Sequence, residues 1–298
     1  MNRLYSEVTG SYIIERDSNN RILHIYQVQN NTKAVLCKIA KGLGVTYSSG
    51  CNTRELGRKL IDKFAAGHNK SCCEVNYGGV THYIAHCFNG TIFAFSLCAS
   101  STSKLSPTVF PQNYTPSRIE LLSYHALWHL LPNYRAQESA LLNLFNKMPN
   151  NASLNDILVK SAALNQFYST NVKHLFEMSN HILQLNIDNC LKCGCLGVVP
   201  KIAKLNTNKG LINYYSFATK YCSFHNAAKF PIYDSYVAKV LYEINGVKSF
   251  QRPFKLIDLK DYYFFADTIN KFQQRFNLSS FTYKDIDRYL WLLGKQYL

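Results

Sequence analysis

The sequence predicts an α+β protein, with an N-terminal domain of mixed α/β structure followed by an all-α domain. Short apolar segments with strand character and turn signals dominate the first hundred residues, whereas helical spacing of apolar side chains dominates the remainder. A segment rich in Ser, Thr and Pro, ASSTSKLSPTVFPQNYTP, separates the two patterns. The predicted domains are therefore residues 1–100 and 117–298, joined by a linker at 101–116.

The N-terminal domain is predicted to contain several strands and a helix. The predicted strands are Ser11–Glu15, Ile22–Val28, Val80–Cys87 and Thr91–Leu97. Between the last two lies Asn89-Gly90, a dipeptide that favours the tight turn of a β-hairpin. Asn52 and Thr53 can cap a helix through RELGRKLIDKF, because the apolar residues of this segment recur every three to four positions.

The C-terminal domain is predicted to consist of helices. Ser117 can cap the first of them, RIELLSYHALWHLL. The other helices predicted from apolar spacing are Ala136–Lys147, Leu154–Gln166, Val172–Leu185, Asn213–Phe224, Asp234–Tyr242 and Thr282–Leu293. Pro231 precedes the helix that Asp234 opens, in keeping with the preference of proline for positions near a helix start.

Composition indicates a globular protein with an anionic partner. Hydrophobic residues make up 47% and aromatic residues 14% of the 298 residues, which excludes a disordered chain. The 33 Lys and Arg residues exceed the 18 Asp and Glu residues, so the formal net charge is +15. Such an excess favours binding to a polyanion, although an ordinary basic soluble protein would also show it.

The cysteines and the N-terminus indicate the compartment. The ten cysteines do not form the short, dense pattern of a secreted disulfide-rich protein, and MNRLYSEVTGSYIIERD has no apolar signal core. No apolar run approaches the length of about eighteen residues that a transmembrane helix needs. We therefore expect a cytoplasmic protein without a membrane partner, in which most cysteines are small buried side chains.

One group of residues has the chemistry of a metal site. Cys190, Cys193 and Cys195, together with Cys222 and His225, could supply four ligands to zinc or to a cluster. The Cys-x-Cys spacing is atypical of such sites, however, and Gly194 between the two cysteines indicates a turn that ends a helix. The sequence therefore predicts no metal and no cofactor.

A basic strip, which we define as residues 189–233, contains no Asp or Glu. Its lysines are Lys192, Lys201, Lys204, Lys209, Lys220 and Lys229. Docking on a phosphate backbone requires such a surface, although a basic run is also common on a merely solvated face. From the strip we predict that Lys192, Lys201, Lys204 and Lys209 bind DNA.

The end of the strip resembles a known family. KFPIYDSYVAKVL is similar to the segment of helix-hairpin-helix DNA glycosylases in which a Pro-Ile or Pro-Val stretch leads to an aspartate at a helix N-terminus. Pro231, Ile232, Asp234 and Val237 match that pattern. Ala218-Thr219-Lys220 lies where the family carries the lysine of its lyase members. The resemblance covers roughly residues 120 to 295.

The resemblance implies a site and a reaction. Asp234 and Lys220 would be catalytic, and Gln166 and Thr219 would contact double-stranded DNA. The aromatic residues around Lys220 would form the pocket for a flipped, damaged or modified base: Tyr214, Tyr215, Phe217 and Tyr221. The carboxylate would stabilise positive charge on the sugar, and a neutral lysine could form a Schiff base with it.

The chain also departs from the family. Ser216-Phe217-Ala218 replaces the glycines of the family's hairpin, which let backbone N–H groups approach a phosphate. Lys220 and Asp234 are 14 positions apart, about one helical turn closer than in the family, and the four-cysteine tail is absent. The leading hypothesis is a monomeric DNA glycosylase. The alternatives are a non-catalytic DNA-binding module on the same fold, and a defence-system component whose strip contacts RNA or a protein.

Overall fold

The computed structural model describes residues 3–9, 12–17, 22–29, 33, 37, 40, 45–52, 55, 56, 59, 72–77, 80–86, 91–98, 110, 114–129 and 131–297. The chain divides into two compact units. Unit 1 comprises Met1–Val109, Pro116–Leu131 and Lys295–Leu298, and unit 2 comprises Phe110–Thr115 and Pro132–Gly294. The described residues combine a β-sheet with many helices, in agreement with the predicted α+β class.

Unit 1 is built on a six-stranded sheet with the order β1-β2-β3-β6-β5-β4. The strands are β1 (Arg3–Thr9), β2 (Tyr12–Asp17), β3 (Ile22–Gln29), β4 (Cys72–Tyr77), β5 (Val80–His86) and β6 (Thr91–Cys98). Two antiparallel three-stranded meanders join through the parallel pair β3 and β6. Four of these strands match the prediction within a few residues, whereas β1 and β4 were not predicted.

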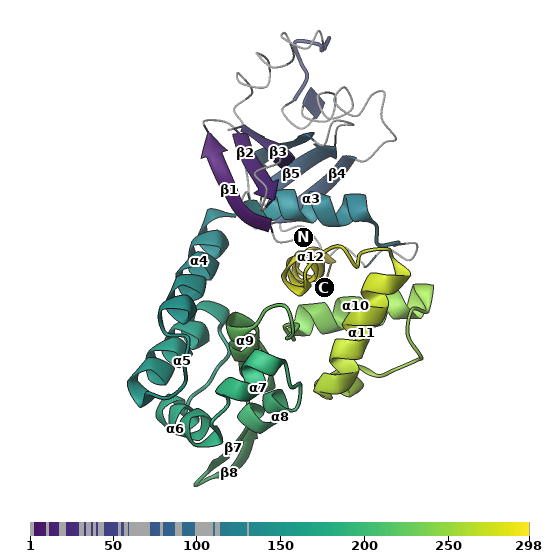
Figure 1. Cartoon of the computed structure of the whole chain (residues 1–298). Coiled ribbons are helices and arrows are strands. Elements are labelled where there is room, and N and C mark those ends of the chain that lie inside the picture. Colours follow the sequence, from purple (N-terminus) through teal and green to yellow (C-terminus); the bar gives the residue numbers. More distant parts are fainter. Residues whose placement is uncertain are drawn as a thin grey trace. The chain divides into compact units, whose positions relative to one another are not determined.

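Helix α3 (Arg118–His129) packs on β5 and β6 of this sheet (Figure 1). The Ser117 hydroxyl accepts a hydrogen bond from the Glu120 N–H, as the sequence predicts for a capping serine. Leu121, Tyr124 and Trp128 are buried on one face of α3, so this helix supplies core to unit 1. The sequence had placed α3 in the C-terminal domain, which was predicted to begin at residue 117.

The predicted helix after Asn52 is described only in part. The Glu55 N–H donates to Asn52 Oδ1 at 2.8 Å, which confirms Asn52 as a cap, and residues 55, 56 and 59 are helical. The predicted Asn89-Gly90 turn lies outside the described residues, as do positions 101–109 and 111–113 of the predicted linker.

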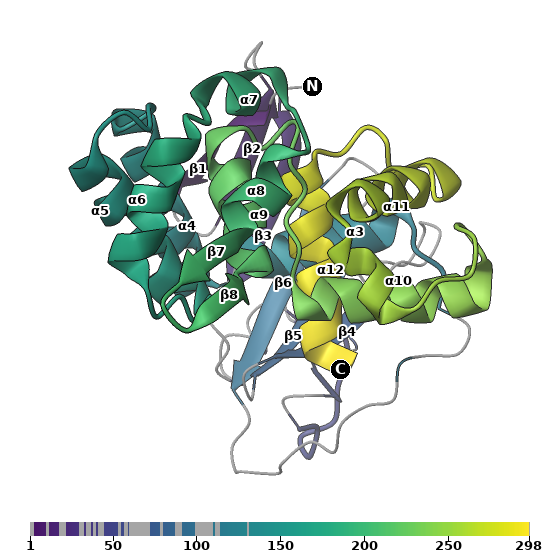
Figure 2. The ribbon, with the colours of Figure 1, turned by 90° about the horizontal axis from the view of Figure 1, so that it is seen from below.

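Unit 2 contains helices and one small hairpin. The helices are α4 (Pro132–Lys147), α5 (Leu154–Tyr168), α6 (Leu175–Leu185), α7 (Asp188–Cys193), α8 (Val198–Ala203), α9 (Tyr215–His225), α10 (Ser235–Lys248), η1 (Leu256–Lys260), α11 (Tyr262–Arg275) and α12 (Tyr283–Tyr297). Figure 2 shows α4 to α9 gathered as one group and α10 to α12 as another. None of the described helices combines the length and the apolar character needed to cross a membrane.

The all-α prediction for the C-terminal domain is wrong at one place. Strands β7 (Lys204–Thr207) and β8 (Gly210–Asn213) form an antiparallel hairpin around Asn208 and Lys209. Gly210 has a φ of +109°, a conformation that side-chain-bearing residues rarely adopt. The Thr207 hydroxyl donates to the Gly210 carbonyl at 2.8 Å and accepts from the Lys209 N–H at 3.2 Å. These local hydrogen bonds stabilise a turn that lacks the usual Asn-Gly signature.

Helix α9 is the central helix of unit 2. It contacts α4, α5, α7 and α8, and nine of its 11 residues are buried. Phe217, Tyr221 and Phe224 are among them, so one side of α9 packs aromatic rings into the core. A helix buried on most sides has little freedom to move, which makes α9 a rigid carrier for any polar side chain that it presents.

A buried lysine on α5 helps to hold α9 in place. Lys160 is fully buried, and its Nζ donates to the carbonyls of Met148 and Asn150 and to Asn151 Oδ1, at 3.0, 2.9 and 2.8 Å. The same Asn151 oxygen accepts a hydrogen bond from the Tyr221 hydroxyl of α9 at 2.5 Å. Burial lowers the pKa of Lys160 to about 8. This ammonium therefore joins α5, the α4–α5 loop and α9 through one acceptor.

We expect Lys160→Met to destabilise the protein by about 2–4 kcal/mol, because two backbone carbonyls would lose their buried donor. Urea unfolding at pH 7 measures the effect. The control is Lys173→Met, which removes an exposed lysine from the α5–α6 loop and should change stability by less than about 0.5 kcal/mol. Equal unfolding midpoints for the two variants would show that the Lys160 hydrogen bonds contribute nothing net.

Candidate functional site

The aspartate at the start of α10 occupies the helix cap that the sequence predicts. Asp234 has extended backbone angles, and its Oδ1 accepts a hydrogen bond from the Tyr236 N–H at 3.0 Å. The segment before it is fixed from α11, because the Tyr262 hydroxyl donates to the Pro231 carbonyl at 2.9 Å. The Asp234 side chain is 23% exposed, so the carboxylate is held in place but remains reachable from solvent.

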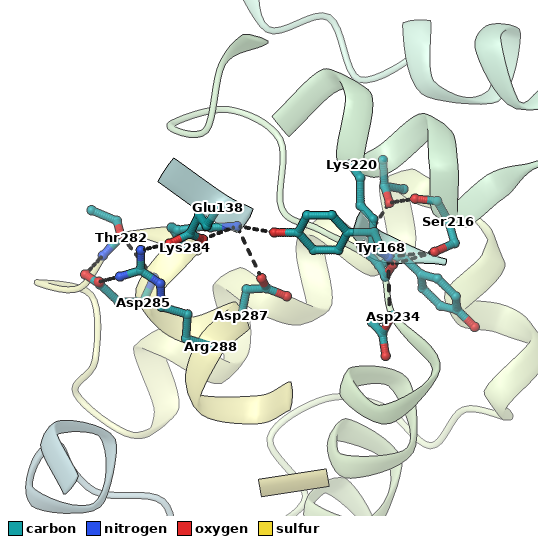
Figure 3. Close-up of polar contacts among 12 residues, drawn as sticks. Glu138, Tyr168, Ser216, Lys220, Asp234, Thr282, Lys284, Asp285, Asp287 and Arg288 are labelled. Carbon is teal, nitrogen blue, oxygen red and sulfur yellow. Dashed lines mark hydrogen bonds and ion pairs between the residues drawn. The ribbon is translucent and has the colours of Figure 1, made fainter. Parts of the chain in front are cut away.

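Lys220 reaches the same point from the middle of α9. Its side chain is only 2% exposed, and its Nζ donates to Ser216 Oγ at 2.7 Å and to the Tyr233 carbonyl at 3.1 Å. The Lys220 Nζ also lies 3.5 Å from Asp234 Oδ2 (Figure 3). The pairing that the sequence predicts between these two residues is therefore present, although Lys220 lies mid-helix and not near the helix start.

Burial lowers the pKa of Lys220. Desolvation disfavours the ammonium and lowers the pKa of Lys220 below its ordinary value, while the charges of Asp234 and Asp287 oppose that shift. The direction is the one that a nucleophilic amine requires, since only the neutral form can attack an electrophile. The contacts thus place a buried lysine of lowered pKa against a carboxylate.

Thr219 aligns the loop that carries Asp234. Its hydroxyl donates to the Ser216 carbonyl at 3.0 Å and accepts from the Tyr233 N–H at 3.1 Å. Thr219 is fully buried, so both hydrogen-bonding roles of the hydroxyl are satisfied inside the protein. Because Thr219 has no exposed atom, it cannot make the predicted contact with DNA. Its side chain instead positions Tyr233 beside Lys220.

Tyr168, for which the sequence predicts no role, lies beside Lys220. The ring belongs to the last residue of α5 and is 5.6 Å from the Lys220 Nζ and 5.7 Å from the Lys284 Nζ. Lys284 also donates to the Tyr168 hydroxyl at 3.3 Å. Figure 3 shows the ring between the two lysines, with its hydroxyl directed toward Lys284. One aromatic side chain therefore connects Lys220 to a second group of charges.

That second group is an ion cluster formed by α4 and α12, and we define it as Glu138, Lys284, Asp287 and Arg288. Lys284 Nζ lies 2.8 Å from Glu138 Oε1 and 3.8 Å from Asp287 Oδ2, and Arg288 pairs with the other Glu138 oxygen. Burial disfavours the Glu138 carboxylate, but the two neighbouring cations outweigh it and lower its pKa to about 2. The buried charges of the cluster are thus paired across two helices.

Within the ion cluster, Asp287 is the carboxylate whose charge acts on Lys220. Burial raises the pKa of Asp287 to about 6, with opposing contributions from Lys284 and Lys220 and supporting ones from Asp234 and Glu138. At neutral pH the site therefore contains a carboxyl group close to its titration point. Little in the sequence singles out Asp287, because it lies on an amphipathic helix, and the charged residues of such helices usually face solvent.

The lysines predicted to bind DNA are exposed. Lys192 lies on α7, Lys201 on α8, Lys204 on β7 and Lys209 in the β7–β8 turn. Gln166 is also exposed, but it lies in the last turn of α5 and not in the loop that follows. All five side chains can reach a ligand in solution, as a contact with nucleic acid requires.

The aromatic residues predicted to form a base pocket differ in exposure. Phe217 and Tyr221 are fully buried, and Tyr215 is nearly so, with its hydroxyl donating to the Leu259 carbonyl at 3.1 Å. These three rings are core side chains of α9. Tyr214, half-exposed at the start of the helix, is the member of the set with an accessible ring. The reason for the difference is that α9 is packed on most sides, which the helical spacing alone did not reveal.

The segment aligned with the family's hairpin is helical. Ser216, Phe217 and Ala218 form part of the first two turns of α9, so no turn exists where the family carries its hairpin glycines. The hairpin of this chain, β7–β8, precedes that point and carries exposed Lys209 in its turn. Any backbone contact with phosphate at this place would have to differ from that of the family.

The cysteine cluster does not gather four ligands. Cys222 is fully buried on α9, while His225 lies near Asn151 and Lys160, with its Nε2 3.3 Å from each partner atom. Burial and the Lys160 charge lower the pKa of His225 to about 3. Over the part of the chain that the structure describes, no group of three or more His, Cys, Asp or Glu side chains is arranged to hold a metal ion.

The raised pKa of Asp287 predicts a pH-dependent stability. An unfolded aspartate loses its proton near pH 3.9 and the folded one near pH 6, so the folded state binds more protons in between and stability falls as pH rises through that window. Asp287→Asn should remove this fall. Its advantage in stability over the wild type should grow from about 1.5 kcal/mol at pH 5 to about 2–3 kcal/mol at pH 8. Urea unfolding at the two pH values is the measurement.

Comparisons with known proteins match part of the chain. The family model HI_0787_N, described as an N-terminal domain, matches residues 120–229. An uncharacterized protein of Haemophilus influenzae is 44% identical over 133 residues, which are 44% of this chain and 63% of that relative. The chain thus spans less than two thirds of the length of the curated relative that it matches. No solved structure matches the chain. Lys220 lies within residues 120–229, which the family model matches, and Asp234 lies just beyond them.

Proposed function

We propose that unit 2 is a DNA glycosylase of the helix-hairpin-helix class that excises a damaged or modified base. The observation that carries the proposal is the buried Lys220 Nζ, 3.5 Å from the Asp234 carboxylate at the start of α10. Proteins rarely place a buried lysine of lowered pKa beside a partly exposed carboxylate without a functional reason, because burying either charge without a partner is costly. The resemblance around KFPIYDSYVAKVL supports the same assignment.

Asp234 would act on the sugar. Cleavage of an N-glycosidic bond builds positive charge on the sugar ring, and a fixed carboxylate stabilises that charge without reorganising during the reaction. At this helix N-terminus the helix dipole interacts favourably with a negatively charged side chain. Because its side chain is 23% exposed while Lys220 is covered, Asp234 is the member of the pair that a nucleotide can reach directly.

Lys220 would act as nucleophile or as a positioning residue. Attack on the sugar requires that its amine leave Ser216 Oγ and the Tyr233 carbonyl and turn past Tyr168. Attack of the amine on C1′ would displace the base, and opening of the sugar ring would then give the imine, which permits strand scission. If the amine stays where it is, it instead orients Asp234, and the attacking group is a water molecule.

The exposed lysines support the choice of DNA as substrate. Lys192, Lys201, Lys204 and Lys209 belong to a segment without acidic residues, and each is free to contact a phosphate. Extrusion of a base costs a few kcal/mol, which must be offset by stacking in a pocket. Tyr214 at the start of α9 and Tyr168 beside Lys220, both partly buried, are the rings that could take this role.

The second candidate function is a non-catalytic DNA-binding module. It is favoured by the completeness of the contacts of Lys220, whose ammonium donates to two oxygens and faces a third, as in a structural tie between α9 and α10. In that case the exposed lysines would bind the phosphate backbone and the site would perform no chemistry. Release of a free base from modified DNA separates the two functions.

We expect Asp234→Asn to reduce base excision by roughly 100-fold or more while leaving DNA affinity within about twofold, because it keeps the shape and removes the charge. Lys220→Gln should abolish the covalent complex trapped by borohydride, since only an amine forms an imine. The measurements are single-turnover excision from oligonucleotides with modified bases, and trapping on an abasic duplex.

The control for Asp234 is Asp261→Asn. Asp261 caps α11 and accepts hydrogen bonds from the Tyr263 and Phe264 N–H groups, so it has the capping role of Asp234 without a buried lysine beside it. If both variants retain excision, Asp234 is only a helix cap. If Asp234→Asn loses excision and wild-type protein cannot be trapped, Lys220 positions Asp234 and water is the nucleophile.

The exposed lysines predict a salt dependence. Replacing Lys201, Lys204 and Lys209 together with Ala should weaken binding to all DNA sequences alike. The slope of log affinity against log salt should decrease by about 0.9 for each phosphate that the variant no longer neutralises. The matched control replaces Lys239, Lys255 and Lys260, which are exposed and lie outside the basic strip. Equal slopes for the two triple variants would show that charge number alone, and not the strip, determines binding.

A further inference from the structure

Two cysteine sulfurs of the basic strip lie in contact. Cys193 is the last residue of α7 and Cys195 follows two positions later, with their Sγ atoms 2.7 Å apart. Both residues are exposed, in contrast to Cys222 in the core. Two thiols this close on the surface can be joined by a bond between their sulfurs without a large movement of the chain.

The backbone around the two cysteines produces this arrangement. Gly194 between them has a φ of +78°, the left-handed conformation that ends many helices and that glycine adopts at little cost. The N–H groups of Gly194 and Cys195 both donate to the Cys190 carbonyl, at 3.1 and 3.0 Å. A Cβ atom at position 194 would lie 2.7 Å from the Lys229 side chain, so the turn is also packed against the α9–α10 connection. The turn therefore directs both thiols to the same side.

Two lysines flank the turn. Lys192 precedes Cys193 in the chain, and the methylene groups of Lys229 lie against Gly194 between the two cysteines. The hydrogen bond with Cys193 raises the pKa of Cys195 to about 11. The raised pKa favours the protonated form of Cys195. We therefore assign the first attack to Cys193 and the resolving step to Cys195.

We propose that Cys193 and Cys195 form a thiol–disulfide exchange site that takes a small-molecule disulfide of the glutathione type. The Cys193 thiolate attacks one sulfur of the disulfide, whose S–S bond breaks and releases one thiol after uptake of a proton. The Cys195 sulfur then gives up its proton and attacks Cys193 in the mixed disulfide, which releases the second thiol. The two cysteines lose two electrons and two protons, and the external disulfide gains them.

The site is independent of the chemistry proposed for Lys220 and Asp234. It uses neither residue, and the exchange can be measured without DNA. A disulfide across a single intervening residue and exposed to solvent belongs to the labile class, which is reduced again readily by small thiols. We therefore expect the pair to cycle with the thiol–disulfide ratio of its surroundings.

Peptide mapping tests the proposal on the full-length protein. Trypsin cleaves after Lys192 and Lys201, so Cys193 and Cys195 share one peptide while Cys190 falls in the preceding one. After incubation with oxidised glutathione and alkylation, the peptide of residues 193–201 should be two hydrogens lighter than its reduced form and unalkylated. Treatment with a small dithiol should restore two alkylation sites.

Variants make the outcome decisive. Cys193→Ser and Cys195→Ser should each prevent the internal disulfide, and Cys195→Ser should accumulate glutathione on Cys193 because the resolving thiol is gone. Cys190→Ser is the control and should still form the disulfide. Full alkylation of both cysteines after oxidation, a disulfide to Cys190, or glutathione that remains on the wild-type pair would each overturn the proposal.

Discussion

The ammonium of Lys220 is the contact on which the geometry of the site depends. It joins the middle of α9 to the Tyr233 carbonyl and to the Asp234 carboxylate, and so fixes the residue at which α10 begins. Thr219 makes the parallel connection one residue earlier, through the Tyr233 N–H. Because α9 is buried on most sides, the hydrogen bonds of these two side chains fix the start of α10 relative to the core. A catalytic carboxylate needs this kind of support, since its effect depends on being held where charge develops.

Ionic and aromatic contacts connect Lys220 and Asp234 to the ion cluster of α4 and α12. Asp234 faces Lys220, Lys220 and Lys284 lie against the Tyr168 ring, and Lys284 pairs with Glu138 and Asp287, as Figure 3 shows. Removing Glu138 from this buried set would leave Lys284 and Arg288 uncompensated, which costs more than the ion pairs contribute when intact. The members also adjust one another's protonation, so that the low pKa of Glu138 keeps it ionised while the pKa of Asp287 is raised to about 6. A change of charge at Lys284 or Asp287 on α12 therefore alters the electrostatic environment of Lys220, although α9 and α12 are far apart in the sequence.

Basic residues serve two different purposes in unit 2. Lys160 and Lys220 are buried and donate to oxygens of the protein itself, whereas Lys192, Lys201, Lys204 and Lys209 are exposed. The first group stabilises the packing of α9, and the second is available to an anionic ligand. The +15 net charge by itself cannot distinguish the two. Burial decides which lysines contribute to the fold and which can contribute to binding, because a buried ammonium must find its acceptors within the protein.

Local signals in the amino-acid order were enough to predict the features that neighbouring residues control. Proline and helical spacing indicated that Asp234 opens a helix, and Asn52 and Ser117 were correctly identified as caps. Of the six lysines in the strip without acids, all but Lys220 prove to be exposed. The partners of the charged residues, in contrast, came from tertiary packing. Glu138 meets Arg288 from 150 positions away, and Tyr168 meets Lys284 from 116 positions away, separations over which no local pattern carries information. Likewise, Phe217 and Tyr221 have the spacing of one helix face whether that face meets a ligand or the core. Burial depends on what the rest of the chain packs against that face, and for these two rings it is the core.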